Sequence, residues 1–238
     1  MNLLVLLEMS AGAMGERVAV ADHSGGLTFE QLFDGAGRAA TWLRGRPVER
    51  VLYTGVSSPA LPVALYGASW AGLPYVPLNY RLADDRLRSL VARQAPAVLV
   101  CDDGTGHRFE GIEGIEVVTA PEFEGIIAAY DPAEPDWPMD EDDVAVLLHT
   151  SGTTGDPKVA VLRHRHLTSY VLGSVEFMGA DEGEATLVSV PPYHIAGIAV
   201  LVTSGFSGRR IVQLPAFEPA EWVRVAREHA VSHAMVVP

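Results

Sequence analysis

The strongest constraint on the fold of this 238-residue chain is a regular alternation of two sequence patterns. Short runs of β-branched and other apolar residues predict strands, and the stretches between them have the apolar spacing of amphipathic helices. Several of the strand-like runs are apolar throughout, which is typical of strands buried on both faces of a parallel sheet. The alternation therefore predicts an α/β fold of strand–helix subdomains with largely parallel sheets.

The predicted elements can be bounded from the same pattern. Thr28 and Gln31 have the spacing of a capping box, which indicates a helix start. Strands are expected at Arg17–Ala21, Arg50–Thr54, Tyr75–Leu78, Ala97–Cys101, Glu116–Thr119, Val144–His149, Val159–Leu162, Thr186–Val190, Arg210–Leu214 and His233–Val237. Helices are expected at Phe29–Arg44, Ala60–Ala71, Asp84–Gln94, Pro121–Ala129, His166–Met178, Ile195–Phe206 and Pro219–His229.

One stretch, residues 131–143, differs in composition from the rest of the chain. It holds three prolines and seven acidic residues, which predicts an extended connector. The chain would then divide into a first α/β subdomain at 1–130, this acidic proline-rich connector, and a second α/β segment at 144–238. The acidic run Asp140–Asp143 could be interpreted as a metal site. The favoured interpretation is a solvated linker, so no metal site is predicted.

The charge and cysteine content narrow the functional classes. With 17 basic and 30 acidic residues the net charge is −13, which disfavours nucleic-acid binding and attraction to anionic membranes. The apolar run Leu3–Leu7 is shorter than the roughly 7–15 residues of a secretory signal core, and nothing approaches the roughly 18 residues of a membrane span. The single cysteine, Cys101, is expected to be buried and inert, and it fits a cytoplasmic protein.

A glycine- and hydroxyl-rich loop follows the predicted strand Val144–His149. It ends in the only lysine of the chain, and its glycines would let backbone N–H groups approach an anion while its hydroxyls add donors. It is not a Walker A loop, because Pro157 precedes the lysine. The alternative is a flexible linker. The predicted phosphate-binding residues are Thr150, Ser151, Gly152, Thr153, Thr154, Gly155 and Lys158.

A second candidate segment, with Tyr193 and His194, follows the predicted strand Thr186–Val190 and two prolines. Such a segment would present its rings at the mouth of a pocket whose wall is the next helix. Small residues such as Gly197 would leave room for an apolar ligand. The alternative is a histidine that only packs and hydrogen-bonds at a helix entry. His164 and His166 are expected to belong to an exposed polar cluster rather than to a metal site.

The loop Thr150–Lys158 resembles the signature loop of the adenylate-forming superfamily. Its members include acyl- and aryl-CoA synthetases, firefly luciferase and the adenylation domains of peptide synthetases. Two residues depart from the family pattern, Val159 in place of glycine and His149 where an aromatic residue is common. Further segments resemble family motifs in the family's order, at Leu27–Leu32, Trp70–Asn79, Val190–Gly197 and Ser232–Pro238.

The resemblance implies part of the large N-terminal domain of an enzyme that activates a carboxylic acid with ATP and Mg²⁺ and transfers it to CoA. The loop would hold the β- and γ-phosphates. His194 would be the catalytic residue beside the acyl carboxylate, and Tyr193, His194 and Gly197 would bind the substrate. By the same resemblance, peptide synthetase domains for amino acids typically carry an Asp in this segment to hold the substrate amine. No acidic residue lies between Ser189 and Val202 here, so the resemblance implies an acid without an α-amino group.

Other functions remain open at this point. One is an acyl-AMP ligase or adenylation domain that loads the pantetheine of a carrier protein, and another is a non-catalytic nucleotide-binding module. Family motifs that complete the Mg²⁺ and ribose sites, and the domain with the catalytic lysine, are not found in these residues. We therefore expect an N-terminal fragment that is inactive alone and whose partner is the missing C-terminal part of the same enzyme.

Overall fold

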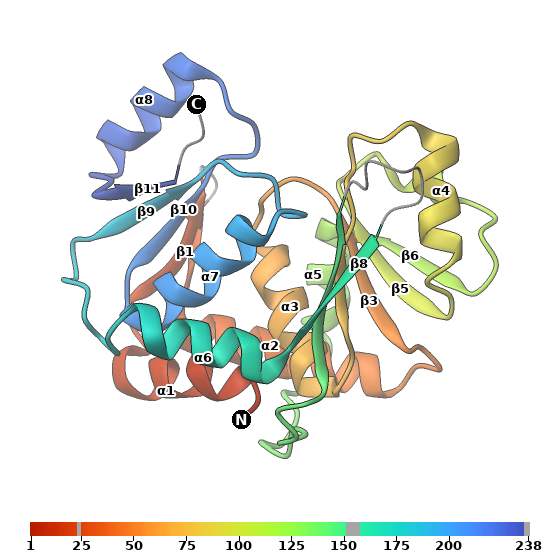
Figure 1. The fold of residues 1–238 in the computed structure, drawn as a ribbon, viewed down its shortest axis with the longest axis horizontal. Helices are drawn as coiled ribbons and strands as arrows, with labels where there is room; N and C mark the ends of the chain where they lie inside the picture. Colours follow the sequence, from red (N-terminus) through yellow and green to blue (C-terminus); the bar gives the residue numbers. More distant parts are fainter. Residues whose placement is uncertain (23–24, 151–157, 236–238) are drawn as a thin grey trace.

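The computed structural model of the chain describes residues 1–22, 25–150 and 158–235 (Figure 1). The helices are α1 (Leu4–Met14), α2 (Phe29–Arg44), α3 (Ala60–Ala71), α4 (Asp84–Ala92), α5 (Ala120–Ile127), α6 (His164–Ser174), α7 (Ile195–Ser207) and α8 (Pro219–Glu228), with a 3₁₀ helix at Gly106–Phe109. The strands are β1 (Val18–Asp22), β2 (Gly25–Thr28), β3 (Arg50–Thr54), β4 (Tyr75–Pro77), β5 (Ala97–Cys101), β6 (Ile115–Thr119), β7 (Val144–Thr150), β8 (Lys158–Arg163), β9 (Ala185–Val188), β10 (Arg210–Gln213) and β11 (His233–Ala234).

In the described part of the chain the strands form two sheets. The first has the order β11-β9-β10-β1-β2 and the second the order β6-β5-β3-β4-β7-β8. Neighbouring strands are parallel except at one edge of each sheet, where β2 pairs antiparallel with β1 and β8 pairs antiparallel with β7. The predicted α/β fold with largely parallel sheets is therefore confirmed.

Helices α2 and α3 lie between the two sheets (Figure 1). Every residue of α3 from Ala60 to Trp70 is buried, as expected for a helix that is apolar on all sides. Helix α2 begins at the predicted capping box, in which Thr28 Oγ1 accepts the Gln31 N–H and Gln31 Oε1 accepts the Thr28 N–H. The small residues of α2 allow close packing, since a β-carbon at Gly37 would lie 3.2 Å from the Trp70 ring.

The predicted chain segments do not coincide with the sheets. Strand β1, from before the connector, pairs with β10 from after it. Strands β7 and β8, also from after the connector, join the sheet of β3 and β4. The connector itself is not wholly solvated, because Trp137 is buried and packs edge-on against Trp70. The Trp70 indole also donates a hydrogen bond to the Glu134 carbonyl. The boundary at 131–143 therefore separates segments of sequence, and each sheet combines strands from both.

Several elements differ from the sequence prediction. Helix α1 was not expected, and it forms because Leu4, Leu6 and Leu7 are buried in the main core. Strand β2 was missed because its glycines disfavour a strand, and pairing with β1 overrides that preference. Helix α6 begins at His164 and ends at Ser174, earlier at both ends than expected. Residues 236–237 of the last predicted strand lie outside the described part.

Candidate functional site

Both predicted functional segments begin where a strand of a parallel sheet ends. Strand β7 runs parallel to β4 and ends at Thr150, and β9 runs parallel to β10 and ends at Val188. In Figure 1 the chain leaves both strands at the upper side of the molecule. The carboxyl edge is where open α/β sheets bind their ligands, so the topology brings the two segments to the expected edge.

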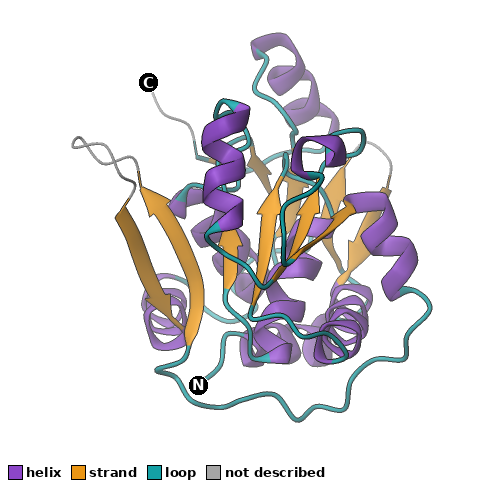
Figure 2. Ribbon diagram, turned by 90° about the vertical axis from the view of Figure 1, so that its right-hand side faces the viewer, coloured by secondary structure: helices purple, strands orange, loops and turns teal. Residues whose placement is uncertain are grey.

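The predicted phosphate loop connects the antiparallel strands β7 and β8. Thr150 lies opposite Lys158 in the register, so the loop starts and ends at one point of the hairpin. The two strands stand at the left edge of the molecule in Figure 2. Lys158 is exposed, and so are Val159 and Val161. The predicted residues Ser151, Gly152, Thr153, Thr154 and Gly155 lie outside the described residues.

The end of this hairpin away from the loop, which we call its base, is held by hydrogen bonds of His164. The His164 N–H donates to the Asp143 carbonyl, and His164 Nδ1 accepts the Leu3 N–H at 3.1 Å. His164 is only 2% exposed, so the expected exposed cluster was wrong for this residue, although His166 is exposed. Burial lowers the pKa of His164 to about 4, with a smaller contribution from the N-terminal ammonium group. A neutral imidazole thus joins β8 to the start of α1.

His149 lies on β7 directly before the loop. Both ring nitrogens are buried, and neither has a hydrogen-bond partner in the described structure. Burial lowers the pKa of this imidazole. A buried polar group without a partner is costly, so His149 is a local weakness in the strand that leads to the loop.

The second segment, Pro191–Gly197, is a tight turn that leads into α7. The His194 N–H donates to the Pro191 carbonyl at 3.1 Å, and the Gly197 N–H donates to the His194 carbonyl at 2.9 Å. A β-carbon at Gly197 would lie 3.2 Å from the Pro191 carbonyl oxygen, so the turn leaves little room for a side chain there. His194 precedes the first residue of α7, and its side chain is exposed.

Three rings form a cluster at this turn. The Tyr193 ring centroid lies 4.7 Å from that of His194 and 5.7 Å from that of Tyr80, in an edge-to-face arrangement. The Arg81 guanidinium lies 5.5 Å from the centroid of the Tyr80 ring. Burial raises the pKa of the Tyr193 phenol, and Arg81 opposes this shift. Because Tyr80 follows β4 and Tyr193 follows β9, the cluster joins the carboxyl edges of the two sheets.

Sequence reasoning did not single out Tyr80 as a site residue. Tyr80 lies directly after Trp70–Asn79, a segment noted only for its resemblance to a family motif. The signal that could have found it is its position after a predicted buried strand, since the ends of parallel strands meet at one edge.

Beside the turn lies a small internal cavity of about 10 Å³. Of the predicted site residues in the described part of the chain, only Gly197 lines it. The loop after β3 supplies Ser57, and the Asp102 carboxylate holds that loop by accepting the Val56 N–H at 3.0 Å. The remaining lining residues are Leu61, Val188, Pro192, Ile198, Leu201, Ile211 and Gln213.

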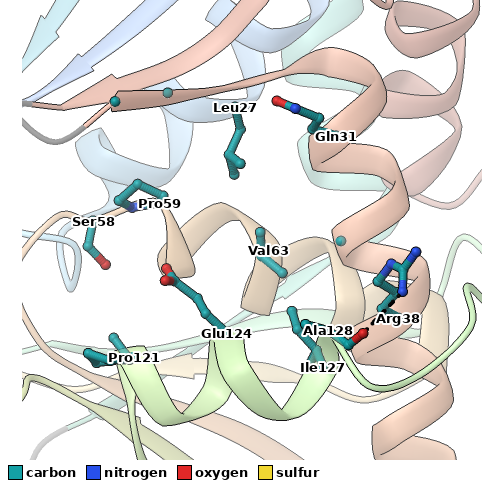
Figure 3. A pocket seen from close by; sticks show the side chains of 14 residues that line it. Leu27, Gln31, Arg38, Ser58, Pro59, Val63, Pro121, Glu124, Ile127 and Ala128 are labelled. Atoms are coloured by element: carbon teal, nitrogen blue, oxygen red, sulfur yellow. Dashed lines mark hydrogen bonds between the residues drawn. The ribbon is translucent and has the colours of Figure 1, made fainter.

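A larger cavity, of about 860 Å³, lies between β2, α2, α3 and α5 (Figure 3). Its lining includes Val63 and Ile127, with the Glu124 carboxylate directed inward. Arg38 at its rim donates to the Tyr130 carbonyl and forms an ion pair with Asp34. None of the predicted site residues that the structure describes lines this cavity.

Two kinds of feature are absent from the residues that the structure describes. They contain no group of three or more His, Cys, Asp or Glu side chains placed to hold a metal ion. They also contain no helix with the length and apolar character needed to cross a membrane. Cys101 is buried as expected, and burial raises the pKa of its thiol, which keeps it in the unreactive protonated form.

The chain matches a known protein family over almost its whole length. The model of the AMP-binding enzyme family matches residues 7–238. This chain belongs to the AMP-binding enzyme family. Its similarity to an adenylate-forming enzyme therefore extends over nearly all its residues, and the predicted family resemblance is confirmed.

Relatives with curated functions and solved structures match across the same region. Feruloyl-CoA synthase of Amycolatopsis sp is 30% identical over 234 residues, which cover 94% of this chain and 46% of the relative. D-alanine–D-alanyl carrier protein ligase of Staphylococcus aureus is 29% identical over 190 residues, which cover 80% of this chain and 38% of the relative. The chain thus spans less than half the length of these relatives.

Solved structures also match nearly the whole of this chain and about half of their own length. ATP-bound MatB from Rhodopseudomonas palustris superposes with a TM-score of 0.80 at 26% identity, covering 95% of this chain and 48% of MatB. O-succinylbenzoate coenzyme A synthetase (MenE) from Bacillus subtilis, solved with AMP, gives a TM-score of 0.83 at 23% identity, with coverages of 98% and 48%. The second similarity shows the fold alone.

Proposed function

We propose that residues 1–238 are the N-terminal part of an AMP-forming acid–thiol ligase. In this proposal the enzyme activates a carboxylic acid as its acyl-adenylate and transfers the acyl group to CoA. The observation that carries the proposal is the position of Thr150 and Lys158, which lie opposite each other at the carboxyl end of β7 in a largely parallel sheet. The chain that holds them matches the AMP-binding family over residues 7–238.

The predicted phosphate loop carries hydrogen-bond donors and a positive charge, which suit the anionic phosphates of ATP. Lys158 provides a compact positive charge opposite Thr150, where the loop leaves the hairpin. We assign the loop residues Thr150, Ser151, Gly152, Thr153, Thr154, Gly155 and Lys158 to the β- and γ-phosphates. Mg²⁺ would neutralise charge where the carboxylate and the α-phosphate, both anionic, must meet. The loop would hold the pyrophosphate so that it leaves in line with the attacking carboxylate.

The turn Pro191–Gly197 is the proposed acyl side of the site. His194 would position the substrate carboxylate, and Tyr193 and Gly197 would shape the pocket beside it. The hydrogen bonds within the turn and the ring contact with Tyr80 support this assignment, because they hold the His194 backbone and Tyr193 ring in place before substrate binds.

The thiol acceptor distinguishes two versions of the proposal. CoA is favoured by the more similar of the two curated relatives described, feruloyl-CoA synthase. The carrier-protein alternative is supported by the similarity to a D-alanyl carrier protein ligase. Measuring thioester formation with CoA and with a pantetheine-bearing carrier protein separates them.

The proposal is tested by ATP–pyrophosphate exchange with the complete enzyme and a panel of carboxylic acids. At least one acid should support exchange that depends on both Mg²⁺ and the acid. Residues 1–238 alone should give no appreciable exchange, because the rest of the enzyme supplies the remaining machinery. Absence of exchange with every acid in the complete enzyme would refute the proposed activity.

A further inference from the structure

One buried polar side chain has no role in the proposed site so far. Gln213 is the last residue of β10, and it is 4% exposed. Its side-chain oxygen, Oε1, is buried and has no hydrogen-bond partner in the described parts of the chain. Buried amide oxygens are nearly always paired, so an unpaired one indicates a missing partner such as a ligand or a water.

The position of Gln213 indicates where a hydrogen-bond partner of its Oε1 would lie. Gln213 lines the small cavity beside the Pro191–Gly197 turn, on the same face of β10 as Ile211. Apart from Gln213 and Ser57, the side chains that line the cavity are apolar. The cavity lies at the carboxyl ends of β9 and β10, where the fold places ligands.

The walls of the cavity are held in place from several elements. Asp102 fixes the loop that carries Ser57, and a β-carbon at Gly55 would lie 2.3 Å from the Asp102 carboxylate, so this contact depends on glycine. On the other side, Gly197 packs on the Pro191–Pro192 backbone. The Leu214 N–H donates to the Val188 carbonyl, which secures the end of β10 beside β9.

The size of the cavity limits what it can accept. A volume of about 10 Å³ has room for roughly one water molecule, or one polar atom of a ligand. A whole acyl chain does not fit. The cavity suits the terminal polar group of a substrate whose apolar part lies along the turn, near Pro192 and Gly197.

We propose that Gln213 is a specificity-determining residue that hydrogen-bonds a terminal hydroxyl or carbonyl group on the otherwise apolar tail of the carboxylic acid. This inference rests on the proposed function. A tail without such a group would leave the amide of Gln213 unpaired in the complex, so acids with apolar ends would be poorer substrates.

The test uses pairs of acids that differ by one hydroxyl group, namely benzoate with para-hydroxybenzoate and cinnamate with para-hydroxycinnamate. In the complete enzyme, kcat/KM from pyrophosphate exchange should be higher for the hydroxylated member of at least one pair. Gln213→Met keeps the volume and removes the amide, and it should lower that preference roughly tenfold or more by weakening use of the hydroxylated acid. Gln94→Met, outside the cavity, should leave the preference unchanged.

The outcomes separate this inference from the proposed function. A wild-type enzyme that uses both members of every pair equally well would overturn the role of Gln213, whether or not the variants fold. An unchanged preference in Gln213→Met, or in Gln213→Leu if the first variant melts early, would mean that the amide only binds a buried water. If no acid supports exchange in the wild-type enzyme, the proposed function fails and this inference fails with it.

Discussion

The two proposed halves of the site, the β7–β8 hairpin and the Pro191–Gly197 turn, are held in different ways. The hairpin is tied at its base through His164, while Lys158, Val159 and Val161 at its other end are exposed. The turn is held along its whole length by internal hydrogen bonds, and the Tyr193 ring contacts Tyr80 from the other sheet.

The two halves differ because the proposed phosphate and acyl sites depend on different parts of the chain. The phosphate side depends on a local sequence, because backbone N–H groups, hydroxyls and one lysine suffice to contact an anion. The acyl side depends on packing between two sheets, because the shape of a pocket is set by residues far apart in the chain. Changes in the hairpin should therefore affect nucleotide chemistry, and changes near the turn should affect the choice and binding of the acid.

The largest expected effect comes from Lys158. Lys158→Ala in the complete enzyme should slow pyrophosphate exchange by roughly 100-fold, because a charge-stabilising donor at the transferring phosphates is lost. Thioester formation from preformed acyl-adenylate should change much less, and Lys158→Arg should retain part of the exchange rate. Unchanged exchange in Lys158→Ala would show that the hairpin does not bind pyrophosphate.

His164, at the base of the hairpin, should make the free energy of unfolding depend on pH. Its pKa is about 4 in the folded chain and near 6.5 when unfolded, so the unfolded chain binds more protons between these values. The free energy of unfolding should therefore fall as the pH drops from about 6.5 through about 4, by about 3 kcal/mol in total. Urea unfolding at a series of pH values measures this slope.

His164→Asn provides the matched control for that slope. The asparagine oxygen can accept the Leu3 N–H in place of Nδ1, and it does not titrate. The variant should lose the His164 contribution to the pH dependence while it remains folded at neutral pH. If the variant and the wild type have the same slope, His164 is not the titrating group.

A smaller effect is expected from the ring that joins the two sheets. Tyr80→Leu should raise the KM for the carboxylic acid about fivefold and leave the KM for ATP unchanged, because Tyr193 loses its edge-to-face contact. Tyr80→Phe keeps the ring and should behave like the wild type. An equal rise in both KM values would contradict the separation of the two halves.

The smallest effect concerns His149. His149→Phe should raise the free energy of unfolding by about 1 kcal/mol, because it removes two buried ring nitrogens that lack partners in the described structure. The exposed His107→Phe is the control, and it should change stability by less than about 0.5 kcal/mol. A loss of stability in His149→Phe would indicate that the imidazole makes a hydrogen bond after all.

Much of the secondary structure could be predicted because it depends on short-range pattern. The bounds of β3, β5, α2 and α3 agree with the sequence prediction residue for residue. The apolar residues that each of these elements buries are spaced in the pattern of a strand or a helix within the element itself. Strand β2 and helix α1 could not be predicted, because a glycine-rich strand and a leucine-rich N-terminal segment take their form from the elements they pack against.

The α/β class, the family resemblance and the position of the predicted phosphate loop could be inferred from the amino-acid sequence, because each depends on contiguous residues. The folded structure was needed to show which strands share a sheet, that His164 is buried, and that Tyr80 and Gln213 lie beside the Pro191–Gly197 turn. These facts depend on contacts between residues more than a hundred positions apart for Tyr80 and His164. Such contacts form only when the chain packs its two sheets around α2 and α3, and no local pattern specifies them.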